Sequence, residues 1–236
     1  MKKLFVLFLL PLLFLSFIPP VNAQVKIGVQ AGANFTEAAM DKEIFNTALR
    51  TRTIIGGIIS YDFLPLLSLQ TEPAYVQKGV KVDAAIDLVN ILNGAANGTI
   101  SANYFEIPVL LKLTIPSVII KPYLLAGGSV AFLLGDPKLT VDKVIFNGQD
   151  ITTNLPSDIK EQPFKIKNTD LILCLGGGIT IPIGLLSLFA EARYDLGLTD
   201  VSDGPYSFDL GITTLSYDTE FKTRGFQLKA GILVGL

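Results

Sequence analysis

Apolar and polar residues alternate most clearly along residues 101–134. One set of alternate positions is almost free of charge. The other set carries the charged and polar side chains, namely Glu106, Lys112, Lys121, Tyr123 and Ser129. Because successive side chains of a β-strand point to opposite faces, this alternation predicts two long strands. A very short turn at about residues 115–117, with Pro116 inside it, is expected to join them.

A soluble hairpin of this length would carry many more charges on its water-facing side. Here one face has almost none, while the opposite face mixes charged, polar and small residues. A strand with lipid on one side and a narrow polar interior on the other shows this two-residue period. The segment therefore predicts a closed antiparallel barrel in an outer membrane.

The same alternation recurs in six more segments, at residues 25–35, 51–61, 66–78, 169–181, 187–198 and 223–236. The connections alternate between long segments at 36–50, 79–99, 135–168 and 199–222 and short ones at 62–65, 115–118 and 182–186. Outer-membrane barrels have short periplasmic turns and long extracellular loops. The predicted fold class is therefore all-β: an eight-stranded antiparallel up-and-down transmembrane β-barrel with such turns and loops.

Local signals add three details to this picture. Short helices are expected near residues 41–49 and 84–92, and a small hairpin is expected within residues 135–168. Pro73 lies inside a predicted strand, where it cannot donate a ladder hydrogen bond. It therefore predicts a bulge or a weak spot in that strand.

Residues 1–23 have the pattern of a secretory signal peptide. Lys2 and Lys3 precede an apolar run, and Val21-Asn22-Ala23 forms a small-residue cleavage site. A retained membrane anchor is the alternative. The predicted domains are a signal peptide at residues 1–23 and one outer-membrane β-barrel domain at residues 24–236, a length that suits a single domain.

Composition narrows the class of protein. The chain is 50% hydrophobic and only 17% charged, below the roughly 25% of ordinary globular domains. Beyond the signal, no apolar window is long enough for a transmembrane helix, which leaves an unusually apolar soluble core or a membrane barrel. A net charge of −2 gives a nucleic-acid partner no electrostatic support. The single cysteine, Cys174, lies in an apolar strand, and we expect it to be buried.

Charged residues on the predicted inner face form the candidate site. They are Glu72, Glu106, Lys112, Lys121, Glu191, Arg193 and Lys229. The interior of an eight-stranded barrel is just wide enough for side chains to fill, so charges there must pair. We expect a structural salt-bridge network that plugs the barrel and fixes its register. The alternatives are a gated or narrow conduit, a proton-linked switch, and catalysis by a carboxylate pair, Glu72/Glu106 or Glu106/Glu191.

Other chemistry finds little support. The chain contains no histidine, which removes serine–histidine–aspartate, cysteine–histidine and histidine–metal sites together. Four loop acids lack ligand spacing and predict a solvated surface: Asp142, Asp150, Asp158 and Glu161. We therefore expect no enzyme activity, no cofactor and no metal. Several aromatic residues predict an interfacial girdle, with ordinary strand propensity as the alternative: Tyr61, Tyr75, Tyr104, Phe105, Tyr123, Tyr194 and Phe221.

Six blocks carry a family resemblance: KIGVQAGANF, LSLQTEPAYVQKG, ANYFEIPVLLKL, VIIKPYLLAGGSV, LSLFAEARYDLGLTDV and RGFQLKAGILVGL. In content and order they resemble the outer-membrane β-barrel family common in Bacteroidetes, often called PorT-like or porin-like. The likeness covers nearly all of residues 24–236. It implies an eight-stranded barrel in the outer membrane of a Gram-negative bacterium, and it does not imply one activity.

The first functional hypothesis is a non-enzymatic, monomeric barrel. Its loops would meet a ligand, or envelope or secretion proteins, and its outer face would meet outer-membrane lipid. The second hypothesis is a small porin-like channel for ions or small solutes, although eight strands leave little open bore. The third is a soluble periplasmic barrel that binds an apolar ligand.

Overall fold

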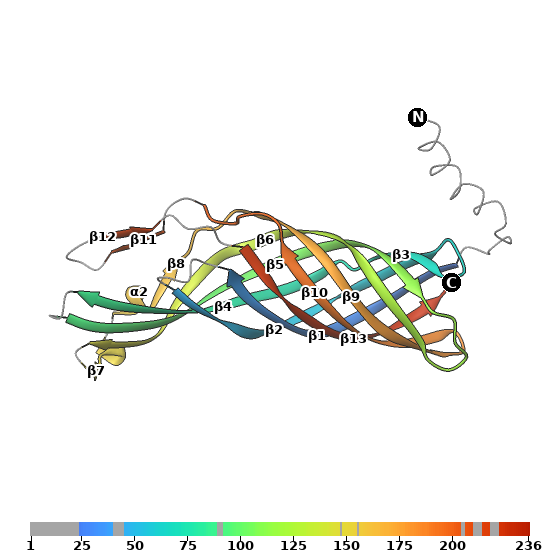
Figure 1. Cartoon of the computed structure of the whole chain (residues 1–236), viewed down its shortest axis with the longest axis horizontal. Coiled ribbons are helices and arrows are strands. Elements are labelled where there is room, and N and C mark those ends of the chain that lie inside the picture. The colour runs from blue at the N-terminus through green and yellow to red at the C-terminus, as the bar shows by residue number, and fades with distance from the viewer. Residues whose placement is uncertain are drawn as a thin grey trace, which may run out of the picture.

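The barrel wall accounts for most of the chain. The computed structural model describes residues 24–39, 45–88, 92–146, 148–154, 156–203, 206–209, 214–217 and 222–236. Within these residues, eight antiparallel strand positions close into a ring that forms the barrel wall (Figure 1). Seven positions are each one strand, and the eighth is shared by β3 and β4. They are β1 (Gln24–Ala39), β2 (Phe45–Asp62), β3 (Leu67–Thr71) with β4 (Ala74–Leu88), β5 (Leu92–Thr114), β6 (Lys121–Phe146), β9 (Thr169–Ile183), β10 (Leu186–Gly197) and β13 (Lys222–Gly235). The ring closes where β1 pairs with β13, which confirms the predicted fold class.

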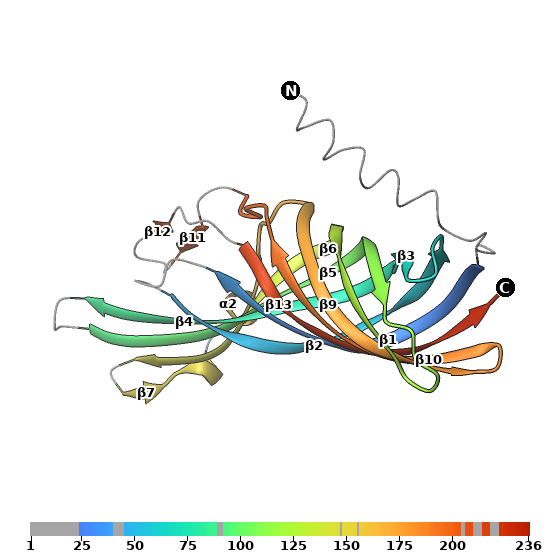
Figure 2. The same cartoon turned by 45° about the vertical axis from the view of Figure 1, so that its right-hand side comes forward.

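The two ends of the barrel differ (Figures 1 and 2). The short turns, the start of β1 and the end of β13 gather at one end of the barrel. At the opposite end, β4, β5 and β6 extend far beyond the other strands. This extended end also carries the short loop elements: β7 (Gln149–Asp150), a 3₁₀ turn (Thr152–Asn154), α2 (Ser157–Lys160), β8 (Glu161–Pro163), β11 (Tyr206–Asp209) and β12 (Thr214–Tyr217). The short turns are periplasmic and the extended end is extracellular.

The long connections are mostly continued strands rather than separate loops. Both predicted helices are wrong as far as the structure describes them, since residues 45–49 belong to β2 and residues 84–88 to β4. Residues 41–44 and 89–92 of these two predictions fall largely outside the described residues, and Leu92 begins β5. The predicted small hairpin is confirmed: β6 turns back at Gly148 and pairs with β7.

Pro73 interrupts a strand without displacing it. The pairs Thr71–Val109 and Ala74–Glu106 keep one common register on either side of the gap between β3 and β4. That register sets Glu72 opposite Pro108 and Pro73 opposite Ile107, and neither proline can donate a ladder hydrogen bond. A bulge at Pro73 is therefore wrong: only the pairing with β5 is interrupted there, and on the other side Gly57 of β2 still donates to the carbonyl of Pro73 at 3.0 Å. The register shift between β2 and β4 lies further along, between Leu49 and Ile54.

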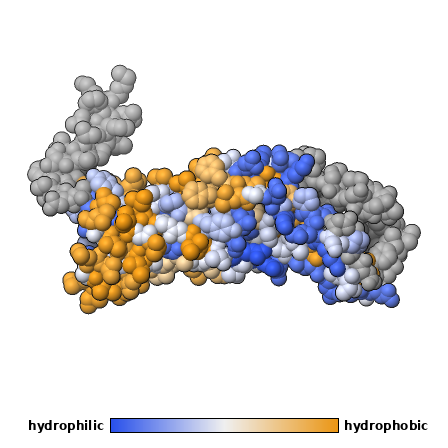
Figure 3. Space-filling view, turned by 180° about the vertical axis from the view of Figure 1, so that it is seen from behind, coloured by the Kyte–Doolittle hydropathy of each residue, from blue (hydrophilic) through white to orange (hydrophobic). Residues whose placement is uncertain are grey.

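The strand alternation sorts side chains into two environments. On β1, Val25, Ile27 and Val29 are exposed, whereas Gln30 and Asn34 are almost fully buried. Large apolar side chains cover the outside over the end with the short turns, and hydrophilic residues cover the opposite end (Figure 3). Within the described residues, helices are too short and too polar to cross a membrane. Cys174 points inward and is buried, as expected.

Candidate functional site

Charged side chains meet in the middle of the barrel interior. We call the residues Glu72, Glu106, Glu191, Arg193, Asp195 and Lys229 the central charge cluster. They project inward from β5, β10 and β13 and from the gap between β3 and β4, and each is at most 9% exposed. Because an unpaired buried charge costs several kcal/mol, the geometry of their pairing decides whether such an interior is stable.

Arg193 holds the cluster together. Its Nη1 lies 3.1 Å from Oε2 of Glu72, and its Nη2 lies 3.3 Å from Oε1 of Glu106. Its Nε lies 3.1 Å from Oδ1 of Asp195, and Nη2 also donates to Oε1 of Gln227 at 2.6 Å. A guanidinium presents several donors in a fixed planar fork, so one side chain can satisfy groups on several walls at once.

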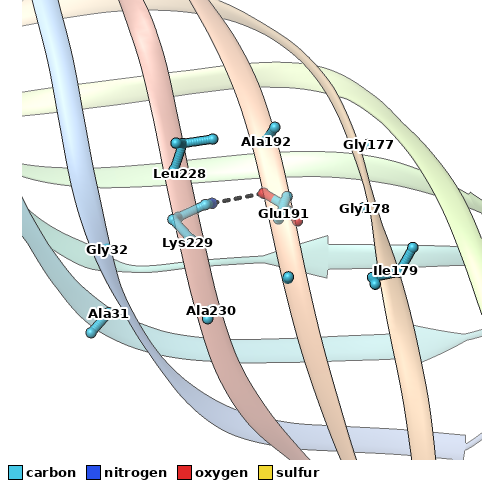
Figure 4. Close-up of a pocket in the computed structure, with 11 residues that line it drawn as sticks. Ala31, Gly32, Gly177, Gly178, Ile179, Glu191, Ala192, Leu228, Lys229 and Ala230 are labelled. Atoms are coloured by element: carbon cyan, nitrogen blue, oxygen red, sulfur yellow. Dashed lines mark ion pairs between the residues drawn. The ribbon is translucent and has the colours of Figure 1, made fainter.

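Lys229 supplies the second cation of the cluster. Its ammonium pairs with Glu72, and with Oε1 of Glu191 at 2.8 Å. Figure 4 shows Lys229 on β13 and Glu191 on β10 pointing toward each other. Glu191 also accepts a hydrogen bond from the hydroxyl of Tyr123 on β6 at 3.0 Å. Glu191 on β10 therefore connects Lys229 on β13 with Tyr123 on β6.

Neutral amides complete the shell around Glu72. Gln70 donates to Oε1 at 2.6 Å, and Gln30 on β1 donates to Oε2 at 3.3 Å. Lys112 on β5 donates to Gln70 at 3.3 Å and lies 3.8 Å above the ring of Tyr123. Since both carboxylate oxygens of Glu72 have donors, this buried charge is fully solvated by protein groups.

Two smaller polar groups lie toward the ends of the interior. On the extracellular side, Lys78 lies 3.5 Å from Asp170, which also accepts from the hydroxyls of Thr199 and Thr223. On the periplasmic side, Lys26 pairs with Asp62 at 2.6 Å. Polar contacts thus occur near both ends of the interior as well as at its centre, where they are densest.

An apolar layer lies between the cluster and the periplasmic mouth. Ile58 on β2, Phe189 on β10 and Leu233 on β13 pack together and are at most 5% exposed. The ring of Phe189 lies against Gly231, where an added Cβ would come within 2.6 Å of the ring. Side chains therefore pack inside the bore on the periplasmic side of the central charge cluster as well, in keeping with an eight-stranded ring.

Six of the seven predicted interior residues come together in this region: Glu72, Glu106, Lys112, Glu191, Arg193 and Lys229. Lys121, the first residue of β6, is partly exposed and takes no part in the ion pairs of the described residues. Further polar residues of the interior lie outside the predicted set, and six of them contact the ion pairs or take part in them: Gln30, Gln70, Lys78, Asp170, Asp195 and Gln227. All six occupy inward alternate positions, so the alternation itself could have found them.

The loop acids are dispersed across the extracellular end. Asp142 accepts from Thr99, Asp150 accepts from Thr152, and Glu161 pairs with Lys138 at 2.8 Å. The side chain of Asp158 lies outside the described residues. Within the described part of the chain, groups of acids or cysteine that could hold a metal ion are absent.

The predicted aromatic girdle is right in part: Tyr75, Phe105 and Tyr194 face outward in register, and Tyr61 is exposed near the periplasmic end of β2. Tyr104 and Tyr123 point inward and are at most 2% exposed, so neither belongs to an outer girdle, and Phe221 lies outside the described residues. The outward aromatics pair across neighbouring strands in two arcs: Tyr75–Phe105–Phe132 and Phe35–Phe226–Tyr194. We call these six residues the aromatic row. We call the exposed, outward apolar side chains of the strands the apolar belt. The aromatic row lies at the extracellular border of this belt, as interfacial aromatics do.

A shallow hollow of about 530 Å³ interrupts the apolar belt. Small outward residues line it, and Figure 4 shows Ala31, Ala192, Ala230 and Gly177 on four neighbouring strands. The Lys229–Glu191 pair lies directly behind this thin part of the wall. The hollow is therefore a consequence of small side chains on the lipid-facing surface.

Comparisons with known proteins match the barrel as a whole. The family model described as outer membrane protein beta-barrel domain matches residues 20–203. No curated protein sequence matches the chain. Among solved structures, OprG from Pseudomonas aeruginosa is 11% identical, with 93% of this chain and 99% of that chain covered and a TM-score of 0.50.

Two further structures are similar at lower scores. Neisserial surface protein A is 14% identical, with 88% of this chain and 96% of that chain covered and a TM-score of 0.40. The outer membrane protease OmpT from Escherichia coli is 8% identical, with 91% and 96% covered and a TM-score of 0.37. At such identities a likeness concerns the fold and not the activity.

Proposed function

The chain belongs to the outer membrane protein β-barrel domain family, and from that premise we propose that it is a non-enzymatic barrel with a sealed interior. Its rigid wall presents the extracellular hairpins to the exterior, where they meet a ligand or an envelope or secretion protein. The unit is a monomer, and outer-membrane lipid surrounds it.

The central charge cluster is the observation that carries this proposal. Arg193 on β10 contacts Glu72 and Glu106, which lie on other walls of the ring, and Lys229 on β13 contacts Glu72 as well. These contacts cross the bore instead of lining it. A set of ion pairs that spans the interior supports a closed, rigid scaffold, and it engages the same carboxylates that a catalytic pair would need.

Display of the extracellular hairpins is tested by surface labelling in intact cells. Lys138, whose side chain is 60% exposed, is replaced by cysteine and treated with a membrane-impermeant maleimide. The native Cys174 is buried, so it gives little background. We expect labelling of K138C in intact cells and of K26C, at the periplasmic mouth, only after the outer membrane is permeabilised. Equal labelling of both variants in intact cells would contradict this topology.

A channel is the second candidate, because polar side chains also line the interior near both mouths, Lys26 and Asp62 at one and Lys78 and Asp170 at the other. Planar-bilayer recording on the refolded protein separates the two functions. The sealed scaffold predicts no steady conductance. Steady conductance that changes in an Arg193→Met variant would support the channel instead.

A soluble periplasmic barrel that binds an apolar ligand is the third candidate. Its interior would have to be apolar and its outside polar, whereas here Glu72 and Lys229 are inside and Val109 and Leu124 are exposed outside. Alkaline carbonate extraction of membranes tests it. We expect the protein to stay in the membrane pellet, and release into the supernatant would favour the soluble barrel.

A further inference from the structure

The three periplasmic turns carry an exposed surface of unusual chemistry. The side chain of Val118 is 92% exposed and that of Leu185 is 80% exposed, and both lie at turn tips. Their exposed apolar neighbours are Phe63, Leu66, Ile115, Ile119, Ile120, Ile183 and Leu186. A turn that stands in water ordinarily carries Gly, Asn, Asp or Ser instead. These turns therefore require an apolar environment.

Charged side chains are absent from the three turns at this end. Residues 63–67, 113–120 and 182–188 contain no Asp, Glu, Lys or Arg. The nearest charged side chains are Lys26 and Asp62, which pair with each other, and Lys112 and Lys121. All four lie on the inward positions of their strands. The mouth of the lumen is polar, while its outer rim is not.

The height of the wall indicates where the membrane ends. From the aromatic row to the periplasmic strand ends, β10 advances by eight residue steps, from Tyr194 to Leu186, and β6 by eleven, from Phe132 to Lys121. At about 3.3 Å per residue and a tilt of about 40°, these lengths correspond to roughly 20 to 28 Å. The apolar band of such barrels is about 25 Å tall. The wall between the aromatic row and the periplasmic strand ends is thus about as tall as the band.

The apolar belt continues without a break into the turns. Leu186 and Leu188 on β10 are exposed belt residues, and the exposed Leu185 of the turn directly precedes Leu186. On the face shown in Figure 3, the apolar surface reaches the end of the molecule. The two-residue turn at Gly184 and Leu185 has its positive-φ residue at Gly184, which leaves Leu185 to project from the tip.

We infer that the periplasmic turns are covered by lipid, so that acyl chains of the periplasmic leaflet surround Val118 and Leu185. The lipid that already covers the belt is the occupant, because the belt and the turns form one continuous surface. The inference rests on the membrane placement of the proposed function. It makes the periplasmic side of this protein a membrane-buried rim rather than a platform for soluble partners.

Single-tryptophan fluorescence tests this inference, because the chain contains no tryptophan. The full chain is refolded into dioleoylphosphatidylcholine nanodiscs, in which both faces are open to solvent. V118W and L185W probe the turns. V109W, in the middle of the belt on β5, is the lipid control, and K138W is the aqueous control. Should either turn variant fail to fold, as judged by heat-modifiable migration, I119W replaces it.

Each probe is quenched by iodide in water and by phosphatidylcholine brominated on its acyl chains. We expect V118W and L185W to be quenched by the brominated lipid and protected from iodide, as V109W is, with emission shifted to the blue of K138W. Turn variants that iodide quenches as strongly as K138W, while V109W responds to lipid, overturn the inference and leave the membrane barrel intact. If iodide also quenches V109W, the membrane placement itself is wrong.

Discussion

Arg193 and Glu72 form an ion pair across the barrel interior, with 3.1 Å between Nη1 and Oε2, although 121 residues separate them in the chain. Arg193 lies on β10, and Glu72 lies in the gap that Pro73 and Pro108 leave between β3 and β4. The gap and the ion pair therefore occur at the same place in the wall. The side-chain contacts of Glu72 link this part of the wall, where the pairing with β5 is interrupted, to the opposite strands.

Removal of Arg193 should destabilise the barrel strongly. Arg193→Met leaves Glu106 and Asp195 without their shortest ion pairs in a buried environment, and breaking a buried pair costs about 3–5 kcal/mol. The matched control is Arg224→Met, which removes an outward, partly exposed pair with Glu37 and should cost at most about 1 kcal/mol. Urea unfolding in lipid vesicles measures both. Equal free energies of unfolding for the two variants would show that the central charge cluster adds no stability.

The position of each residue on the inner or outer face could be predicted from the sequence, because a two-residue period is a local property. Glu72, Arg193 and Lys229 lie inside as the alternation requires, and Ile27 and Val109 lie outside. The pairing within the cluster could not be predicted. Which carboxylate meets Arg193 depends on how eight strands are staggered around a closed ring, and no local pattern encodes that stagger.

Two errors have different physical causes. Residues 84–88 continue β4 because their backbone pairs with residues 92–96 of β5, and a hairpin that extends beyond the membrane does not need the alternation of a lipid-facing strand. Tyr123 was expected in an outer girdle, yet it shares its alternate positions with Lys121 and Ser129 and points inward. For Tyr123 the two-residue alternation predicts the correct, inward side, whereas the preference of aromatic residues for membrane interfaces predicts the wrong one.

Gly178 should tolerate no larger side chain. A Cβ at this position would lie 2.3 Å from the carbonyl oxygen of Ala190 and 2.6 Å from the hydroxyl of Tyr123. Gly178→Ala must therefore displace Tyr123 from Glu191, and we expect a loss of about 1–3 kcal/mol, as for an overpacked core. Gly57→Ala is the control, because the nearest atom to its Cβ lies at 3.7 Å. Thermal unfolding compares the two, and a G178A barrel as stable as G57A would contradict the close contact.

The carboxyl group of Asp150, in the extracellular region, should titrate below its ordinary range. The hydroxyl and the backbone N–H of Thr152 both donate to it, and these hydrogen bonds lower its pKa. A lowered pKa in the folded state stabilises the loop above the unfolded pKa, and this stabilisation is lost as pH falls through the folded pKa. Thr152→Val removes one donor and should raise the pKa toward the usual value. Carbon-13 NMR of the carboxyl group measures this shift, with Thr153→Val as the control; an unchanged pKa in T152V would exclude the hydroxyl as a cause.

A lysine on the outside of β5 should have an effect that depends on its height in the wall. Val109 is 54% exposed in the middle of the apolar belt, and Asn103 lies on the same outward face beyond Phe105 of the aromatic row. A cation in the hydrocarbon costs about 2–4 kcal/mol at the midplane of a barrel and about 0–1 near the interface. We therefore expect Val109→Lys to lower the free energy of unfolding in vesicles by the larger amount and Asn103→Lys by the smaller. In detergent micelles, which adapt to the protein surface, the difference should shrink. If V109K and N103K unfold alike in vesicles, Val109 is not in contact with lipid and the apolar belt has another partner.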